Sequence, residues 1–146
     1  MVTYLIQLFV GVIGGMAASF QASFVGLIEE KFSTLTSVFI TYVGGGALMT
    51  IIFFGSGGRL PEWRAVPWYT YLAGPLGLVI IASLSFTVPR MGAATATTLF
   101  VTAWLILNAI SDHFGWFGVV QPLQLTRLAG IAALLVGTYL MVRPSS

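Results

Sequence analysis

The sequence predicts an all-α membrane protein with five transmembrane helices. Of its 146 residues, 58% are hydrophobic and only 7% are charged, and the mean hydropathy is +0.98. Soluble domains carry about 25% charged residues, and a soluble fold of this length cannot bury so much apolar surface. The apolar runs also lack the alternation of apolar and polar residues that is typical of membrane-spanning β-strands. Lipid is therefore the expected solvent.

Six basic and four acidic side chains divide the chain into uncharged runs, and each run is a candidate helix. A transmembrane helix needs about 20 mostly apolar residues. Four runs meet this length directly, and the fifth meets it if Arg127 extends its guanidinium group to the lipid headgroups. We predict one domain, residues 1–146, with transmembrane helices over residues 3–28, 34–54, 68–88, 92–111 and 123–142.

The helix predicted over residues 3–28 is rich in small residues, a pattern that lets two helix backbones approach closely in a membrane. Four of them, spaced in pairs four positions apart, are Gly11, Gly15, Ala18 and Ala22. The same stretch contains Ser19 and Gln21. Because an amide in lipid must find a partner, Gln21 either ties helices together or faces an aqueous cavity.

The helix predicted over residues 34–54 contains the run YVGGGALMT, which begins at Tyr42. Three successive glycines cost helix stability, so close packing or local flexibility has to compensate. We predict that Gly44 and Gly45 pack against a neighbouring helix. Tyr42 and the preceding Thr41 either line a pore or pack in the same way.

The helix predicted over residues 68–88 begins among aromatic residues and contains a possible break. The aromatic residues, which suit the membrane–water interface, are Trp63, Trp68 and Tyr69. Gly74 and Pro75 follow within the helix. Because proline removes a backbone hydrogen bond, this pair is either a local adjustment of shape or a hinge of the kind that transporters use.

The helix predicted over residues 92–111 carries threonines whose hydroxyl groups can bond the carbonyls of their own helix, as is common in membranes. Trp104 and Asn108 are four positions apart and therefore lie on one helical face. That face is either a cavity wall or a helix–helix contact. The candidate residues of a substrate cavity are accordingly Ser19, Gln21, Tyr42, Trp104 and Asn108.

Asp112 and His113 are expected to mark the end of this fourth helix, where it meets water. A zinc site usually has three or four protein ligands, whereas the chain has one histidine, no cysteine and four acidic residues in all. The sequence therefore predicts no enzyme, no metal site and no cofactor. Nucleic-acid binding is not expected either, because there is no basic patch.

The positive charges are balanced between the two sides of the membrane. With five helices, one side receives Arg59, Arg64 and Arg127, and the other receives Lys31, Arg90 and Arg143. The positive-inside rule orients a chain by the difference between the two sides, which is zero here. Such a chain is expected to have dual topology and to pair with an inverted copy, unless these small counts balance by accident.

Several short motifs occur together along the chain. The most specific is DHFG at residues 112–115, and the others are PRMGA from Pro89, QP at Gln121, RLAG from Arg127, QA at Gln21 and PW at Pro67. In these motifs, nearly the whole chain resembles the YdcZ family, a small bacterial group within the drug/metabolite transporter superfamily.

The resemblance implies a five-helix protein of the bacterial inner membrane that forms half of an antiparallel assembly, with a second copy or a homologous inverted subunit. The superfamily exports or exchanges small metabolites and cationic compounds. This chain departs from the family pattern at Val25, where an asparagine is usual, and at Ala103–Trp104, where Gly-Gln is usual. The loss of polar groups is typical of one half of a heterodimer, whereas the balanced charges favour a homodimer.

The expected function is small-solute transport by alternating access, performed by an antiparallel dimer in contact with membrane lipid. A narrow passive channel formed by the same pair is one alternative. A membrane subunit that does not itself transport is another, because the predicted helices contain no charge near the middle of the membrane.

Overall fold

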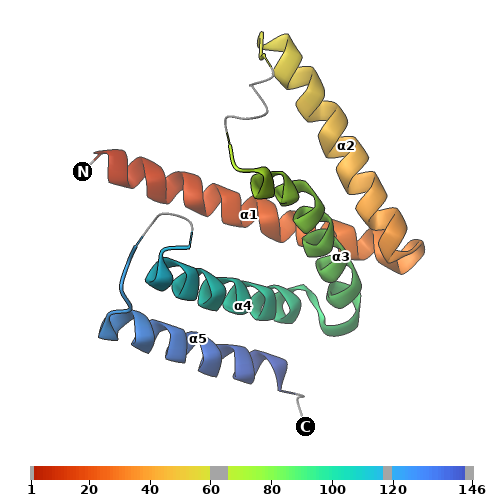
Figure 1. Cartoon of the computed structure of the whole chain (residues 1–146). Coiled ribbons are helices and arrows are strands. Elements are labelled where there is room, and N and C mark those ends of the chain that lie inside the picture. Colours follow the sequence, from red (N-terminus) through yellow and green to blue (C-terminus); the bar gives the residue numbers. More distant parts are fainter. Residues whose placement is uncertain (1, 60–65, 117–119, 144–146) are drawn as a thin grey trace. The chain divides into compact units, whose positions relative to one another are not determined.

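The computed structural model describes residues 2–59, 66–116 and 120–143. Its helices are α1 (Val2–Lys31), α2 (Thr34–Gly55), α3 (Ala73–Met91), α4 (Ala93–Phe114) and α5 (Leu125–Val142), and a 3₁₀ helix, η1 (Trp68–Leu72), precedes α3 (Figure 1). Five segments are long and apolar enough to cross a membrane, with η1 and α3 together forming the third. The prediction of an all-helical chain with five membrane-spanning segments is confirmed. The predictions for Trp63 and Arg64 lie outside the described residues.

Three helices continue beyond the ends predicted from the charge pattern. Helix α1 ends at Lys31 instead of residue 28, α3 ends at Met91 instead of 88, and α4 ends at Phe114 instead of 111. The first charged residue shows where the chain reaches the membrane surface, but backbone hydrogen bonding continues through the polar interface. Polar side chains therefore occupy the last turn of each of these helices.

The contacts divide the chain into two compact units, residues 1–90 and residues 91–146. The first unit, here called the α1–α3 unit, contains α1, α2, η1 and α3, and the second, the α4–α5 unit, contains α4 and α5. The single domain predicted from the sequence therefore stays a prediction.

In the α1–α3 unit, a two-residue turn at Phe32 and Ser33 reverses the chain between α1 and α2. Ser33 has an extended backbone and caps α2, because its hydroxyl group accepts a hydrogen bond of 3.2 Å from the backbone N–H of Thr36. Figure 1 shows α1 and α2 diverging from this turn. The buried residues of the unit lie toward the turn: Ala22, Val25, Gly26, Ser37, Ile81, Leu84, Ser85 and Val88.

Small residues in α1 permit close packing only near this turn. A Cβ atom added to Gly26 would lie 2.6 Å from Cγ1 of Val88, so only glycine fits there, and Ala22 is 1% exposed. The other small residues predicted to pack have open surroundings within the chain. Ala18 is exposed, and an added Cβ would meet no atom within 4 Å at Gly11, Gly15, Gly44 or Gly45. Their packing role stays a prediction and would need a second chain.

In the α4–α5 unit, a hydrogen bond of 2.6 Å joins the buried hydroxyl groups of Thr102 and Thr138. Thr97 and Thr98 donate to carbonyls of their own helix at 2.7 Å, as predicted, whereas Thr95 and Thr102 bond to α5 instead, at the Met141 carbonyl and the Thr138 hydroxyl group. Polar groups between the two helices are thus satisfied without any charged side chain.

Asp112 and His113 lie in the last turn of α4, and Gly115 ends the helix in a left-handed conformation with φ of 67°. The chain then returns to this helix end. The backbone N–H of Gln121 donates to the Asp112 carbonyl at 2.9 Å, and that of Leu123 donates to Nδ1 of His113 at 3.3 Å. The prediction that Asp112 and His113 mark a helix end is therefore confirmed.

Candidate functional site

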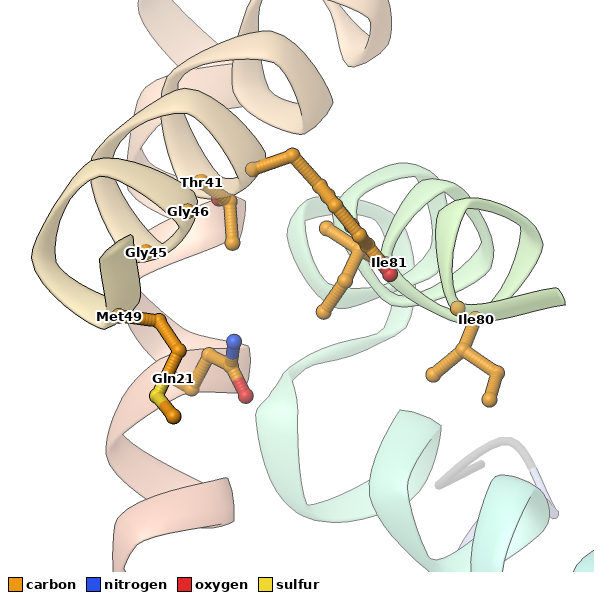
Figure 2. A pocket seen from close by; sticks show the side chains of 9 residues that line it. Gln21, Thr41, Gly45, Gly46, Met49, Ile80 and Ile81 are labelled. Atoms are coloured by element: carbon orange, nitrogen blue, oxygen red, sulfur yellow. The ribbon is translucent and has the colours of Figure 1, made fainter. Parts of the chain in front are cut away.

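A cavity of about 490 Å³, open to the outside of the single chain, lies among the helices of the α1–α3 unit, and most of its lining residues are exposed (Figure 2). Small-molecule sites in proteins commonly have volumes of about 300–1,000 Å³. Its lining comes from all three helices: Gln21 of α1; Thr41, Tyr42, Gly45, Gly46 and Met49 of α2; and Gly77, Ile80 and Ile81 of α3. The cavity is therefore large enough for a small metabolite.

Two polar groups of the cavity are exposed and have no hydrogen-bond partner among the described residues. They are the amide of Gln21 and the hydroxyl group of Tyr42. Thr41 differs, because its hydroxyl group donates to the carbonyl of Ser37 at 2.8 Å. Each free group can donate and accept a hydrogen bond. The cavity thus offers two polar groups to a bound solute.

The position of Tyr42 depends on a glycine in the facing helix. A Cβ atom added to Gly77 would collide with the Tyr42 hydroxyl oxygen. Gly77 therefore lets the phenol group reach the backbone of α3 at the cavity wall. This glycine was not among the site residues predicted from the sequence, because its role depends on which residue faces it.

The rest of the lining is apolar. Figure 2 shows Met49 near Gln21, on the side formed by α1 and α2, with Ile80 and Ile81 on the α3 side. Gly45 and Gly46 contribute only backbone to the wall. A solute in the cavity would thus contact a flexible thioether and branched aliphatic side chains.

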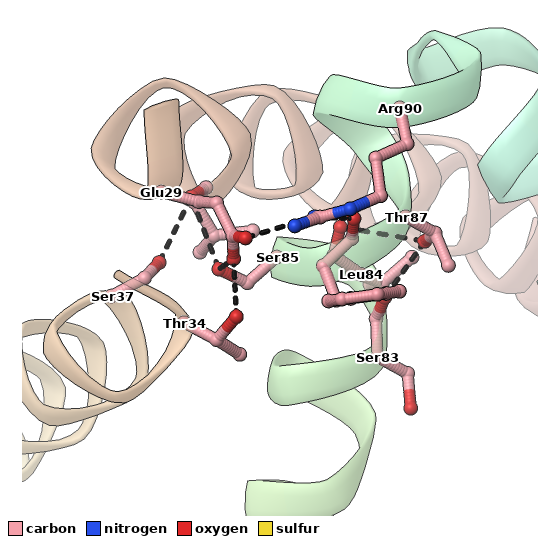
Figure 3. Close-up of polar contacts among 10 residues, drawn as sticks. Glu29, Thr34, Ser37, Ser83, Leu84, Ser85, Thr87 and Arg90 are labelled. Atoms are coloured by element: carbon pink, nitrogen blue, oxygen red, sulfur yellow. Dashed lines mark hydrogen bonds and ion pairs between the residues drawn. The ribbon is translucent and has the colours of Figure 1, made fainter. Parts of the chain in front are cut away.

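A polar cluster joins the three helices at one end of this unit (Figure 3). Its centre is the carboxylate of Glu29, whose side chain is 9% exposed. Oε1 of Glu29 accepts a hydrogen bond of 2.9 Å from Nη1 of Arg90, and the two residues form an ion pair. Oε2 accepts hydrogen bonds from the hydroxyl groups of Thr34 at 2.5 Å and Ser85 at 3.1 Å.

Further hydrogen bonds strengthen the same contact. The fully buried hydroxyl group of Ser37 donates to the carbonyl of Val25 at 2.9 Å, and that of Ser85, also fully buried, shares its one hydrogen between Oε2 of Glu29 and the Val25 carbonyl, which is 3.4 Å away. The guanidinium of Arg90 also donates to the Phe86 carbonyl and lies 3.6 Å from the centroid of the Phe86 ring. We call Glu29, Thr34, Ser37, Ser85 and Arg90 the Glu29 cluster.

The cluster and the cavity lie at different levels of the unit. Gln21 is eight positions from Glu29, and Ile81 is nine positions from Arg90. At 1.5 Å of rise per residue, the cavity begins about 12 Å from the Glu29–Arg90 ion pair, although the buried serines of the cluster are only about 6 Å from it. The ion pair therefore lies toward one end of the unit, and the cavity lies further along the same helices.

The comparisons with known proteins place the whole chain in one family. Residues 6–140 match the family described as "Putative inner membrane exporter, YdcZ". The chain belongs to this family. No curated protein and no solved structure matched the chain.

Membership of the YdcZ family makes the chain a multi-pass protein of the inner membrane and assigns it to membrane transport. The resemblance inferred from the DHFG, PRMGA and RLAG motifs is therefore confirmed. The structure also gives two residues of the DHFG motif a physical role, because the imidazole of its histidine accepts a hydrogen bond from the returning chain and its glycine ends α4.

The structure brings together two of the five residues predicted to line a cavity in this exporter. Gln21 and Tyr42 share the cavity of the α1–α3 unit. Ser19 does not line it, and its carbonyl accepts a hydrogen bond of 3.1 Å from the Ser23 hydroxyl group. Trp104 and Asn108 are exposed residues of the α4–α5 unit. Their assignment to a substrate cavity stays a prediction.

The pair predicted as a hinge, Gly74 and Pro75, lies in the first turn of α3, directly after η1. Proline is favourable at the start of a helix, since the missing N–H would have no partner there. The pair thus marks the junction between the 3₁₀ and α-helical parts of the third span. Movement at this junction stays a prediction.

Proposed function

We propose that this chain is one half of a small-molecule exporter that works by alternating access, and that the cavity of the α1–α3 unit is its substrate site. The observation that carries the proposal is a cavity with two unpartnered polar groups, Gln21 and Tyr42, in a membrane-spanning unit. Polar groups in lipid are costly unless they find partners. A solute or water in the cavity would supply them.

The depth of the cavity supports this assignment. The apolar core of a bilayer is about 30 Å thick, and the cavity begins about 12 Å along the helices from the Glu29–Arg90 ion pair. If the charged Glu29 cluster lies at the membrane surface, the cavity lies near the middle of the membrane. Many transporters bind their substrate at this depth, between two inverted structural repeats.

The second half of the exporter is proposed to be an inverted copy of the chain or a homologous inverted subunit. Two observations support this. The basic residues are divided equally between the two sides of the membrane. The small residues at Gly11, Gly15 and Gly44 have open surroundings, as expected of a surface that another helix covers.

Cysteine labelling in native membranes tests the proposal, because the chain contains no cysteine of its own. Ser56→Cys places a thiol at the end of α2, and Thr41→Cys places one in the cavity. For an inverted pair, membrane-impermeant reagents should label position 56 from both sides of the membrane. For alternating access, they should also reach position 41 from both sides.

Labelling of position 56 from one side alone would refute pairing with an inverted copy. The partner would then be a different protein, such as a homologous inverted subunit. Failure of every reagent, neutral or charged, to reach position 41 would refute the cavity as a substrate site. Conductance of purified protein in planar bilayers would separate the exporter from a channel, because ion currents far above transporter rates would refute alternating access.

A further inference from the structure

We infer that the cavity binds uncharged small molecules that have a hydrogen-bonding end and an apolar body, and that it excludes cations. The inference rests on the proposed function, because it concerns the substrate class of the same cavity. The superfamily transports both small metabolites and cationic compounds, and the inference narrows the expected substrates of this cavity to uncharged molecules.

The described lining of the cavity carries no charge. None of the described residues that line the cavity is acidic or basic. Among the described residues, the acidic side chains belong to Glu29, Glu30 and Asp112, and all three lie in the last turns of α1 or α4. A cation in the membrane interior needs a nearby carboxylate to offset its loss of hydration. The described cavity offers none.

The carboxylate nearest to the cavity along α1 already has partners for both of its oxygens. Glu29 lies eight positions from Gln21 on the same helical face, about 12 Å along the axis. Both of its oxygens accept hydrogen bonds, one from Arg90 and the other from Thr34 and Ser85. The positive charge of Arg90 offsets that of the carboxylate. Glu29 is therefore not available to balance a cationic solute in the cavity.

The cavity offers neutral hydrogen-bonding groups and an apolar surface. The amide of Gln21 and the phenol of Tyr42 each provide a donor and an acceptor, which fit an amide, hydroxyl or similar neutral group. Met49, Ile80 and Ile81 provide an apolar surface for the rest of the solute. A second copy in an antiparallel pair would repeat these residues and add no carboxylate at this depth.

The test measures the electrical preference of the cavity without requiring the natural substrate. Purified full-length Thr41→Cys protein in nanodiscs is reacted with three methanethiosulfonates that differ in charge: neutral hydroxyethyl, cationic trimethylammonium-ethyl and anionic sulfonatoethyl. The reaction rates are divided by those of Ser56→Cys, whose thiol lies at the exposed end of α2. This division removes the intrinsic reactivity of each reagent.

The expected result is that the neutral reagent reacts at position 41 at least about tenfold faster, after normalisation, than the cationic reagent. Adding Gln21→Glu should raise the normalised rate of the cationic reagent about tenfold, because it places a carboxylate in the cavity. The matched control is Gln7→Glu, the same change in α1 outside the cavity lining. It should leave the ratio unchanged.

Two other results would overturn the inference, and they differ in meaning. If the cationic reagent reacts at position 41 as fast as the neutral one, the cavity admits cations. The inference then fails while the proposed substrate site stands. If all three reagents react at position 56 but none reacts at position 41, the cavity is closed to solutes. In that case the proposed function fails as well.

Discussion

The Glu29 cluster provides a quantitative test of how the α1–α3 unit is held together. Glu29→Gln keeps the shape of the side chain but removes its charge, and it presents an NH₂ group to neighbours that are themselves donors. Hydrogen bonds to charged groups contribute about 1.5–3 kcal/mol each, whereas a half-exposed ion pair contributes about 1 kcal/mol or less. The Arg90 side chain is 50% exposed and that of Glu29 is 9% exposed.

We therefore expect Glu29→Gln to lower the free energy of unfolding by about 2 kcal/mol. Arg90→Gln should cost about 1 kcal/mol, because Thr34 and Ser85 continue to donate to the carboxylate. The double variant should cost less than the sum of the two. The difference, which is the coupling energy of the ion pair, should be about 0.5–1 kcal/mol.

Equilibrium unfolding in mixed micelles, followed by far-ultraviolet circular dichroism, measures these values for the wild type, both single variants and the double variant. Glu30→Gln is the matched control, since Glu30 lies beside Glu29 in α1 but has no ion pair or hydrogen bond through its side chain in the described part of the chain. A coupling energy below about 0.3 kcal/mol would refute the ion pair. If Glu30→Gln lowers the free energy of unfolding as much as Glu29→Gln does, the Glu29 cluster does not stabilise the unit.

Three further outcomes are expected. Gly77→Ala should slow thiol labelling at position 41 several-fold by displacing the Tyr42 hydroxyl group. Adding Tyr42→Phe should restore the rate; if it does not, the contact between Gly77 and the Tyr42 hydroxyl group is contradicted. Gly115→Ala should cost about 1–2 kcal/mol in the same unfolding assay, because φ is 67° at this helix end. Thr102→Val should cost about 0.5–1 kcal/mol by removing the hydrogen bond to Thr138; a value near zero would show that the bond adds no stability.

The number and order of the membrane-spanning helices were predictable because hydropathy acts over a whole segment. About 20 apolar residues must remain in lipid whatever their neighbours are. The ends of the helices were less predictable, because α1, α3 and α4 all continue beyond the ends predicted for them. Charged residues indicate where lipid ends, but the helix ends where backbone hydrogen bonding stops, as at Gly115.

The polar residues of the cavity were predictable from the sequence, but its apolar residues were not. Gln21 and Tyr42 were noticeable because polar side chains in an apolar run require an explanation. Met49, Ile80 and Ile81 resemble every other apolar residue of their helices. Which of them faces a cavity depends on the angle at which α2 and α3 approach each other, and this angle arises from contacts between distant segments. Sequence periodicity contains little information about such contacts.

The unequal use of polar groups along the α1–α3 unit bears on how the exporter would work. At the Glu29 end, the hydroxyl groups of Ser37 and Ser85 are consumed in contacts between helices, whereas Gln21 and Tyr42 in the cavity are left free. The helices are therefore held together at the Glu29 end, and the polar groups of the cavity beyond it are available to bind a solute. In an inverted pair, the Glu29 ends of the two chains would lie on opposite sides of the membrane. Opening to one side would then require the release of only one Glu29 cluster at a time, so Glu29→Gln should favour a state open at the cluster end.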